Sequence, residues 1–284
     1  MLFSSVDLAA RIERAERRLV EAAVDATGRL HPGEDVYLRI AAGGAAAHVR
    51  EGSPLNKFIG LGFEGPLGES ALVEIERVFA ERGAPLQVEL STLADPSLAL
   101  LLTGRGYSLV GFENVLGRDI ANASAAELPA GVSVRRIDAA AEEELGPWLD
   151  VVIDGFAHPD TGGVPAHESF PRDVLEASMR DMAGTEGFVL FQAEFDGRTA
   201  GGASMFVAGD VVNLCGAATA PALRRRGVQT ALLAERLRLA RADGARVAVV
   251  TTQPGSKSQE NVQRQGFSLL YTRAILVRTP DAPS

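Results

Sequence analysis

Cysteine is nearly absent from this chain, and its scarcity excludes two kinds of site. With Cys215 as the single cysteine, no disulfide can form within the chain. The histidines are few and scattered, and no cysteine or histidine pair has the spacing of metal ligands. We therefore expect no metal site. Unpaired cysteine suits a reducing compartment, so we expect a cytoplasmic protein.

Long apolar runs and an excess of positive charge are also missing. No stretch approaches the roughly 18 uncharged apolar residues of a membrane-spanning helix, so we expect no membrane partner. The N-terminal segment is charged from Asp7 onward and lacks the apolar centre of a signal peptide. The formal net charge is −9 and neither half is basic, which argues against nucleic-acid binding. The negative field weakly favours a cationic substrate such as an amine.

What the chain does contain is typical of a globular protein with room for two domains. It has 284 residues, of which 46% are hydrophobic and 23% charged. Residues 119–131 are small and polar and end in proline and glycine, as a linker does. We therefore expect a first domain at 1–120, a linker at 121–131 and a second domain at 132–284.

The two halves share a pattern at a fixed offset. Gly106-Tyr107-Ser108-Leu109 recurs 160 residues later as Gly266-Phe267-Ser268-Leu269. A glycine-terminated helix and a short apolar strand precede both copies at nearly the same distance, with glycines at Gly83 and Gly244. Matched order with near-constant spacing predicts an internal duplication.

The most informative segment lies between an apolar run and a helix. Residues 211–219 are β-branched or small and predict a buried strand, and Pro221 forbids its continuation in a central ladder. Three arginines and Gly227 follow, and residues 228–242 have helical spacing. The first N–H groups of a helix lack intrahelical partners and lie at the positive end of its dipole. This order therefore predicts a site for a phosphate group.

The elements that follow make the pattern more specific. Residues 246–252 predict a second buried strand, 258–265 a short helix, and 268–278 a last strand after Gly266-Phe267. This succession resembles the GNAT superfamily of N-acyltransferases over residues 130–278. Arg224, Gly227 and Gln229 stand at the defined positions of its acetyl-CoA motif, where Gln229 replaces the usual glycine or alanine. The second motif is matched by Ser258, Asn261, Gly266 and Phe267.

The resemblance implies the fold class and the cosubstrate. We expect an α/β (α+β) protein of two GNAT-like domains, each a mixed, mostly antiparallel central sheet flanked by helices. In that fold two strands splay apart and coenzyme A lies between them. The residues expected to bind acetyl-CoA are Ala217, Ala218, Thr219, Arg224, Arg225, Arg226, Gly227, Val228, Gln229, Thr230, Asn261 and Arg264.

The first half lacks the cofactor loop. Where the basic turn should stand, residues 63–69 contain no arginine and instead carry Glu64 and Glu69. Carboxylates at a helix start suit the helix dipole but repel a pyrophosphate. We therefore expect a degenerate GNAT-like domain without coenzyme A, or else an unrelated α/β cap. In both interpretations the first half is not catalytic.

The catalytic groups are less defined than the cofactor loop. Attack by an amine requires a base, and Glu194, on a predicted strand at 188–195, is the leading candidate. Asp154, His158 and Asp160 lie where the resemblance expects the acceptor pocket, at about 151–170. The family's usual acid is a tyrosine, but Val262 stands at that position, so Tyr271 is a candidate by its place in the fold alone. Cys215 is interpreted as a small buried hydrophobic residue.

Three functions remain open at this point. The first is an acyl-CoA-dependent N-acyltransferase that acetylates a small primary amine by direct attack in a ternary complex. The second is a non-catalytic acetyl-CoA-binding regulatory module, suggested by Val262 and Gln229. The third is a protein acetyltransferase whose first half recruits the protein. We expect a monomer or homodimer in each case.

Overall fold

The structure is a computed structural model that describes residues 2–121, 128–158, 164 and 169–280. The first half contains α1 (Val6–Leu30), β1 (Tyr37–Ala41), β2 (Gly44–His48), β3 (Lys57–Ile59), α2 (Glu69–Glu81), β4 (Leu86–Ser91), α3 (Ser97–Gly104) and β5 (Ser108–Asp119). The second half contains β6 (Val132–Ile137), α4 (Glu142–Ala157), α5 (Arg172–Ala183), β7 (Phe188–Phe195), β8 (Arg198–Ala208), β9 (Val211–Asn213), β10 (Ala217–Thr219), a 3₁₀ turn at Pro221–Leu223, α6 (Val228–Ala242), β11 (Val247–Thr252), α7 (Lys257–Arg264) and β12 (Ser268–Arg278).

All the described strands join one sheet, and its order shows that the two halves exchange strands. The order is β1-β2-β3-β4-β12-β5-β11-β9-β8-β7-β6, with β10 attached to β8 alone. The last strand of the chain, β12, therefore pairs with β4 of the first half, while β5 pairs with β11 of the second. Only the β3–β4 and β9–β11 pairs among the described strands are parallel. The expected fold class, a mixed and mostly antiparallel sheet flanked by helices, is confirmed.

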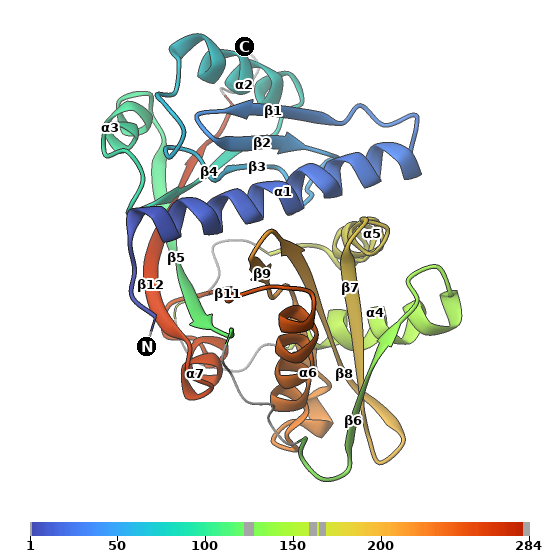
Figure 1. Ribbon diagram of the computed structural model, residues 1–284. Coiled ribbons are helices and arrows are strands. Elements are labelled where there is room, and N and C mark those ends of the chain that lie inside the picture. The colour runs from blue at the N-terminus through green and yellow to red at the C-terminus, as the bar shows by residue number, and fades with distance from the viewer. Residues whose placement is uncertain (1, 122–127, 159–163, 165–168, 281–284) are drawn as a thin grey trace.

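The helices cover both faces of this sheet, and strand alternation decides which residue faces which helix. Val211 packs beneath α1, whereas Val212 packs against α6. In the same way Val115 faces α1 and Leu116 faces α6. Figure 1 shows α1 running across the molecule, with β1–β4, α2 and α3 on one side of it and α4, α6 and β6–β8 on the other. The face beneath α1 therefore belongs to both halves.

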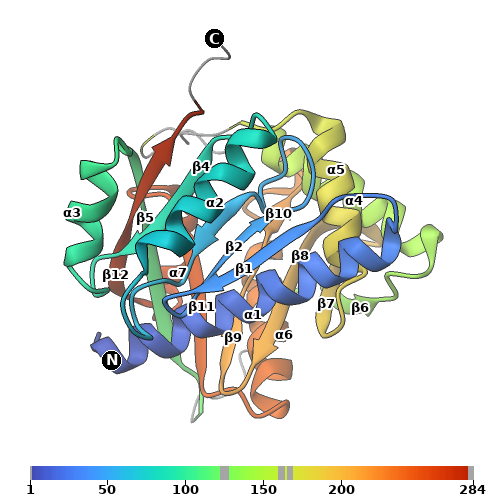
Figure 2. The same cartoon turned by 90° about the horizontal axis from the view of Figure 1, so that it is seen from above.

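Helix α1 has the cap and the apolar stripe that its sequence requires. The Ser5 hydroxyl accepts the N–H of Leu8 at 3.1 Å, which satisfies one donor of the first turn. Its apolar stripe is buried, with Leu8, Ile12, Ala15, Leu19 and Ala23 turned to the sheet. Figure 2 shows α5 crossing near the C-terminal end of α1, where His31 contacts Asp181 at 2.8 Å. The helix thus fastens the first half to the second.

The repeated residues begin the two exchanged strands. Gly106 and Gly266 both have positive φ angles, 85° and 84°, and they lie two residues before the first residues of β5 and β12. The two strands lie side by side and run antiparallel, with Ser268 beside Gly117 and Val277 beside Ser108. The predicted strand at 268–278 and the helix at 228–242 have the bounds of β12 and α6. The duplication and the domain boundaries stay predictions, and residues 122–127 of the linker lie outside the described part.

Candidate active site at the break between β9 and β10

The strand predicted at 211–219 is broken in two. Strand β9 runs parallel to β11 as far as Asn213 beside Val249, and the N–H of Leu214 donates to the Val249 carbonyl at 2.9 Å. Beyond that bond the chain turns away, and β10 pairs only with β8. Strand β11 continues to Thr252 with β5 on its other edge. The prediction of one continuous strand was therefore wrong, and the strands that follow the break splay apart.

A buried arginine holds the break. The Arg236 side chain, on α6, is 4% exposed and donates to the carbonyls of Ser204 at 3.2 Å and Cys215 at 3.3 Å. Its Nε donates to Leu232 at 3.2 Å, and no carboxylate of the described residues pairs with it. Burial lowers the pKa of Arg236 to about 10, so the guanidinium stays charged near neutral pH. The sequence analysis missed Arg236, although its place midway between buried Leu232 and Ala240 marks the apolar face of the helix.

Three side chains beside the break have buried polar atoms without hydrogen-bond partners. They are Oγ1 of Thr219 on β10, Oγ1 of Thr252 on β11 and Nδ2 of Asn213 on β9. Alternation places Thr219 and Thr252 on the α6 side of the two splayed strands, because Ala217 and Val250 pack against the core beneath α6. A buried hydroxyl without a partner costs about 1–3 kcal/mol. A polar ligand between β10 and β11 would satisfy these atoms, so the site fits such a ligand.

The helix that follows begins without a side-chain cap. Gly227 is its N-cap residue with φ 83°, the first turn contains no acidic residue, and the N–H of Ala231 donates to the Gly227 carbonyl at 2.9 Å. Arg225 also has a positive φ, 63°, which gives the turn before α6 its sharp bend. The positive end of the α6 dipole therefore stands behind three arginines, as an anion site requires.

The end of the linker lies against this helix start. A Cβ on Gly227 would lie 2.6 Å from two side-chain carbons of Pro129, so glycine is required there for space as well as for its positive φ. Arg226 stacks over the Phe195 ring at 5.6 Å, and Arg224 donates to the His158 carbonyl. Arg225 and Arg226 are exposed. The basic turn thus touches both the linker and the end of α4 while keeping two arginines in solvent.

The remaining residues expected at the cofactor are distributed along both sides of the break. Ala218 is buried against α4, where a Cβ on Gly155 would lie 2.5 Å from the Ala218 Cβ. Ala217 is half-buried on the opposite face. Val228 is buried, whereas Gln229, Thr230 and Asn261 are half-buried. Arg264 is exposed and pairs with Glu260.

Neither predicted catalytic side chain lies beside the break. Glu194 is on β7, two strand spacings (about 10 Å) from β10, and its Oε1 accepts a hydrogen bond from the Gln192 side-chain amide at 3.4 Å. The Tyr271 hydroxyl is buried and donates to Oε1 of Glu13 at 2.6 Å. Burial and the Glu13 charge raise the pKa of Tyr271 well above its ordinary value. Its strand, β12, is separated from β11 by β5.

The other acceptor candidates lie at the end of α4. The exposed His158 ring nitrogen Nδ1 is 3.2 Å from Oδ1 of Asp154. Because the His158 carbonyl also accepts from Arg224, the end of α4 reaches the basic turn. Asp160 lies outside the described residues.

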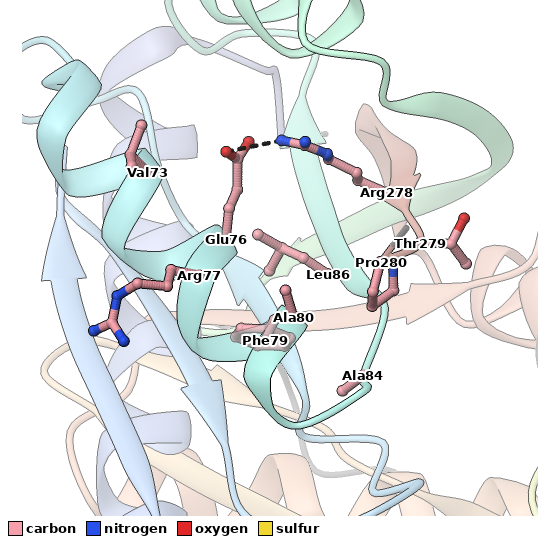
Figure 3. A pocket seen from close by; sticks show the side chains of 10 residues that line it. All are labelled: Val73, Glu76, Arg77, Phe79, Ala80, Ala84, Leu86, Arg278, Thr279 and Pro280. Carbon is pink, nitrogen blue, oxygen red and sulfur yellow. Dashed lines mark ion pairs between the residues drawn. The ribbon is translucent and has the colours of Figure 1, made fainter. Parts of the chain in front are cut away.

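Two hollows in the described part of the chain lie away from the break. One, of about 240 Å³, is formed by α2, the start of β4 and residues 278–280, and Figure 3 shows Glu76 facing Arg278 across it, with an ion pair of 2.8 Å. The other, of about 370 Å³, is lined by Arg11, Asp119, Asp210 and Arg246 among others. None of the residues expected to bind acetyl-CoA lines either hollow.

The described residues hold no helix that is long and apolar enough to cross a membrane. They also hold no group of three histidine, cysteine, aspartate or glutamate side chains arranged to bind a metal ion.

Comparison with known proteins agrees with this geometry. Residues 118–252, just under half of the chain, match the family model described as acetyltransferase (GNAT) domain. Among solved structures, a GCN5-related N-acetyltransferase from Kribbella flavida is similar with a TM-score of 0.65 and 20% identity, covering 94% of this chain and 96% of that one. No curated protein matches.

Two other solved structures share the fold over nearly the whole length. A GCN5-related N-acetyltransferase from Sphaerobacter thermophilus has a TM-score of 0.55 and 18% identity, over 95% of this chain and 94% of that one. A tandem GNAT protein from the clavulanic acid biosynthesis pathway has a TM-score of 0.59 and 11% identity, over 96% and 98%. Residues 118–252 therefore match a GNAT acetyltransferase domain, and the chain has the fold of these GNAT proteins over nearly its whole length.

Proposed function

We propose that the protein is an N-acetyltransferase that transfers an acetyl group from acetyl-CoA to a primary amine by direct attack in a ternary complex. The observation that carries the proposal is the break between β9 and β10. There two strands part, the threonine hydroxyls of Thr219 and Thr252 on these strands lack partners, and an uncapped helix start with three arginines stands at the end of β10.

The residues around the break have distinct roles in this proposal. The main-chain N–H groups at the start of α6, with Arg225 and Arg226, hold the pyrophosphate of coenzyme A. Residues 217–219, Thr252 and Asn261 hold its pantetheine arm, and Arg264 meets the nucleotide end. A main-chain N–H of β10 stabilises the oxyanion that forms when the amine attacks the thioester carbonyl.

The proton transfers follow from the chemistry of the reaction. The ammonium form of the amine must lose a proton before its nitrogen can attack, and the departing thiolate must gain one. Glu194 is the base predicted from the sequence, and Tyr271 the predicted acid. Glu194→Gln and Tyr271→Phe test these roles through the dependence of thiol release on pH.

A non-catalytic acetyl-CoA-binding module is the second candidate. Two observations favour it: Val262 stands where the family has its tyrosine, and Pro129 lies against the N-cap of α6. Both candidates bind coenzyme A. Only the enzyme releases thiol from acetyl-CoA in proportion to added amine, so a thiol-release screen across polyamine, aminoglycoside, amino-acid and peptide acceptors separates them. A preference for peptides would favour the protein acetyltransferase.

A calorimetric titration with coenzyme A tests the proposal. We expect one site per chain. Arg226→Glu should abolish binding because it places a carboxylate against the pyrophosphate at the end of the helix. Arg18→Glu makes the same charge change at an exposed position on α1 and should leave binding unaltered. Equal affinity in the wild type and Arg226→Glu would rule the site out.

A further inference from the structure

A cluster of ionisable side chains lies between α1 and the sheet, on the face opposite α6. Its members come from five elements: Glu13 and Glu16 (α1), Lys57 (β3), Glu89 (β4), Glu113 (β5) and Arg273 (β12). We call these six residues the inter-half cluster. The first half supplies all of them except Arg273, and no sequence motif indicated the cluster.

Within the inter-half cluster, the carboxylate of Glu113 takes part in no ion pair of the described residues. Arg273 is fully buried and lies 2.8 Å from Glu13 and 3.4 Å from Glu89, and it also contacts Glu16. Lys57 lies 2.8 Å from Glu89. Both cations are therefore engaged. Glu113 has neither a hydrogen bond nor an ion pair in the described part of the chain.

A second observation does not depend on the count of charges. Oε2 of Glu13 is buried without a hydrogen-bond partner, although the residue is only 1% exposed. Such an atom is costly unless something outside the protein satisfies it. Two carboxylates of the cluster, Glu13 and Glu113, therefore keep oxygens that no donor in the described part of the chain satisfies, and a positively charged hydrogen-bond donor would suit them.

The position of Glu113 connects the cluster to the break. Its neighbour Asn114 pairs with Thr252, the last residue of β11, so Glu113 stands beside the end of the strand that borders the break. Alternation puts its side chain on the same face as Val115, beneath α1. The nearby charges of Glu16 and Lys57 act on Glu113, and the same two charges act on Cys215, which lies inside the break. The inter-half cluster therefore borders the break from the face opposite α6.

The cluster is accessible from solvent at this place. Glu16 and Lys57 are partly exposed, Glu113 is half-buried, and Gly216 in the break is exposed. Burial, and then the charge of Glu89, raise the pKa of Glu113 to about 7. A group that titrates near neutral pH can both accept and release a proton under ordinary conditions.

We propose that the inter-half cluster is the acceptor site, that it binds a cationic amine, and that Glu113 is the base that takes its proton. This inference rests on the proposed function. The ammonium group gives one proton to the Glu113 carboxylate, and the neutral nitrogen then attacks the thioester carbon. Attack forms the C–N bond and places the negative charge on the carbonyl oxygen. When the carbonyl re-forms, the C–S bond breaks, and the second nitrogen proton passes to the departing thiolate. Glu113 afterwards releases its proton to solvent.

Calorimetry with cationic probes tests the site before any substrate is known. We would titrate 1,4-diaminobutane, spermidine and lysinamide into the protein with and without coenzyme A, with 1,4-butanediol as the neutral analogue. At least one cation should bind and the diol should not. Glu113→Gln should weaken that binding by more than about tenfold. Asp119→Asn, on the same strand, is the matched control and should change nothing.

Turnover adds a readout that a structural role would not move. For a cation that is acetylated, kcat/KM should rise with pH through about 7 in the wild type. Glu113→Gln should remove that rise and lower kcat/KM by about 100-fold or more. Its affinity for coenzyme A should stay that of the wild type. Glu194→Gln changes the base predicted from the sequence, so it is measured in parallel to separate the two candidates: it keeps the pH-dependent rise only if Glu113 is the base.

The outcomes separate this inference from the proposed function. If no cation binds, or if Glu113→Gln binds the cations as the wild type does, the acceptor site is wrong even when coenzyme A binds. If the cations bind through Glu113 but coenzyme A does not bind, the acceptor site stands and the transferase is wrong. If only Glu194→Gln lost the pH-dependent rise of kcat/KM, Glu194 on β7 would be the base and Glu113 would not.

Discussion

The two halves use the same strand–turn–helix arrangement and finish it differently. In the first half β3 runs parallel to β4, and in the second β9 runs parallel to β11. After β3 the chain closes on itself, because the Asp95 N–H donates to the Gly62 carbonyl at 3.1 Å and the Gly62 N–H donates to Ala42 at 2.8 Å. After β9 the corresponding bonds stop at Leu214. In the first half the chain itself therefore occupies the space after the parallel strand. In the second half the corresponding space between β10 and β11 is left for a ligand.

The helix starts differ in the same sense. Helix α2 begins with Glu69 in its first turn and follows Glu64, which pairs with Arg14 at 2.7 Å. Helix α6 has no acid in its first turn and follows three arginines. A Cβ on Gly62 would meet Leu98 at 2.6 Å, so the first half also lacks space. The shared order of strand, turn and helix is therefore not enough to form a cofactor site. A site also needs strand edges without hydrogen-bond partners and positive charge at the start of the helix.

The largest expected effect comes from removing the side chain that holds the break. Arg236→Met removes the guanidinium that donates to the carbonyls of Ser204 and Cys215, and the Cys215 carbonyl then keeps only the Ser204 N–H at 3.3 Å. We expect a loss of about 1–3 kcal/mol in unfolding free energy and a loss of coenzyme A affinity of at least about tenfold, measured by urea denaturation and calorimetry.

The matched control is Arg238→Met, on the same helix. Arg238 is exposed and pairs with Glu235 at 2.7 Å, so its loss should change stability by less than about 0.5 kcal/mol. If Arg236→Met retained full affinity, the break would be held by other contacts.

The next effect separates stability from binding. Thr219→Val and Thr252→Val each remove a buried hydroxyl that has no partner in the protein. Each variant should unfold at the same or higher denaturant concentration than the wild type, and each should bind coenzyme A several-fold more weakly. Thr27→Val serves as contrast, because its hydroxyl donates to Ala23 at 3.1 Å: it should lose stability and keep affinity. Equal losses of stability in all three variants would contradict a ligand role for the two hydroxyls.

The stability of the protein should depend on pH through Glu113, on the exchanged strand β5. The pKa of Glu113 is raised to about 7 in the folded protein, against an ordinary value of 4.5, so the folded state binds more protons than the unfolded state between these values. The stability contribution of Glu113 therefore falls as pH rises from about 4.5 to about 7 and stays low above it.

Glu113→Gln lacks this penalty. Its melting temperature should exceed that of the wild type at pH 8, and the difference should shrink as pH falls toward 4.5. Differential scanning calorimetry at four pH values measures this. A constant difference across the range would contradict the perturbed carboxyl.

The smallest effect is expected in the first half. Reversing the charge at its helix start with Glu64→Arg and Glu69→Arg should leave coenzyme A at one site per chain, because the Gly62–Asp95 bond and Leu98 still close the gap. Calorimetric stoichiometry measures this. A second site would mean that charge alone separates the two halves.

Local elements were predictable from the sequence, and long-range pairing was not. The apolar periodicity of residues 228–242 and the alternation of 188–195 gave the bounds of α6 and β7. The break at Leu214–Gly216 was missed because residues on either side are equally small or β-branched, and Arg236 imposes it from a distant helix. The exchange of β5 and β12 was missed because the two strands follow the same repeated motif, so the sequence does not show which half each strand joins.

The same limit applies to the candidate site. The arginine turn and residues 217–219 could be predicted because the family resemblance depends on residue spacing along the chain. Glu113 carries no local signal: its surroundings come from α1, β3, β4 and β12, which only the folded chain brings together. From the sequence the first half is expected not to be catalytic, whereas in the folded chain it supplies five of the six residues of the proposed acceptor site.

Amide hydrogen exchange with and without coenzyme A tests the central claim most directly, because it reports both halves in one experiment. We predict that coenzyme A protects the amides of residues 217–219 and 225–230 and leaves residues 60–69 unchanged. Protection at 60–69, or none at the start of α6 under saturating coenzyme A, would contradict the account.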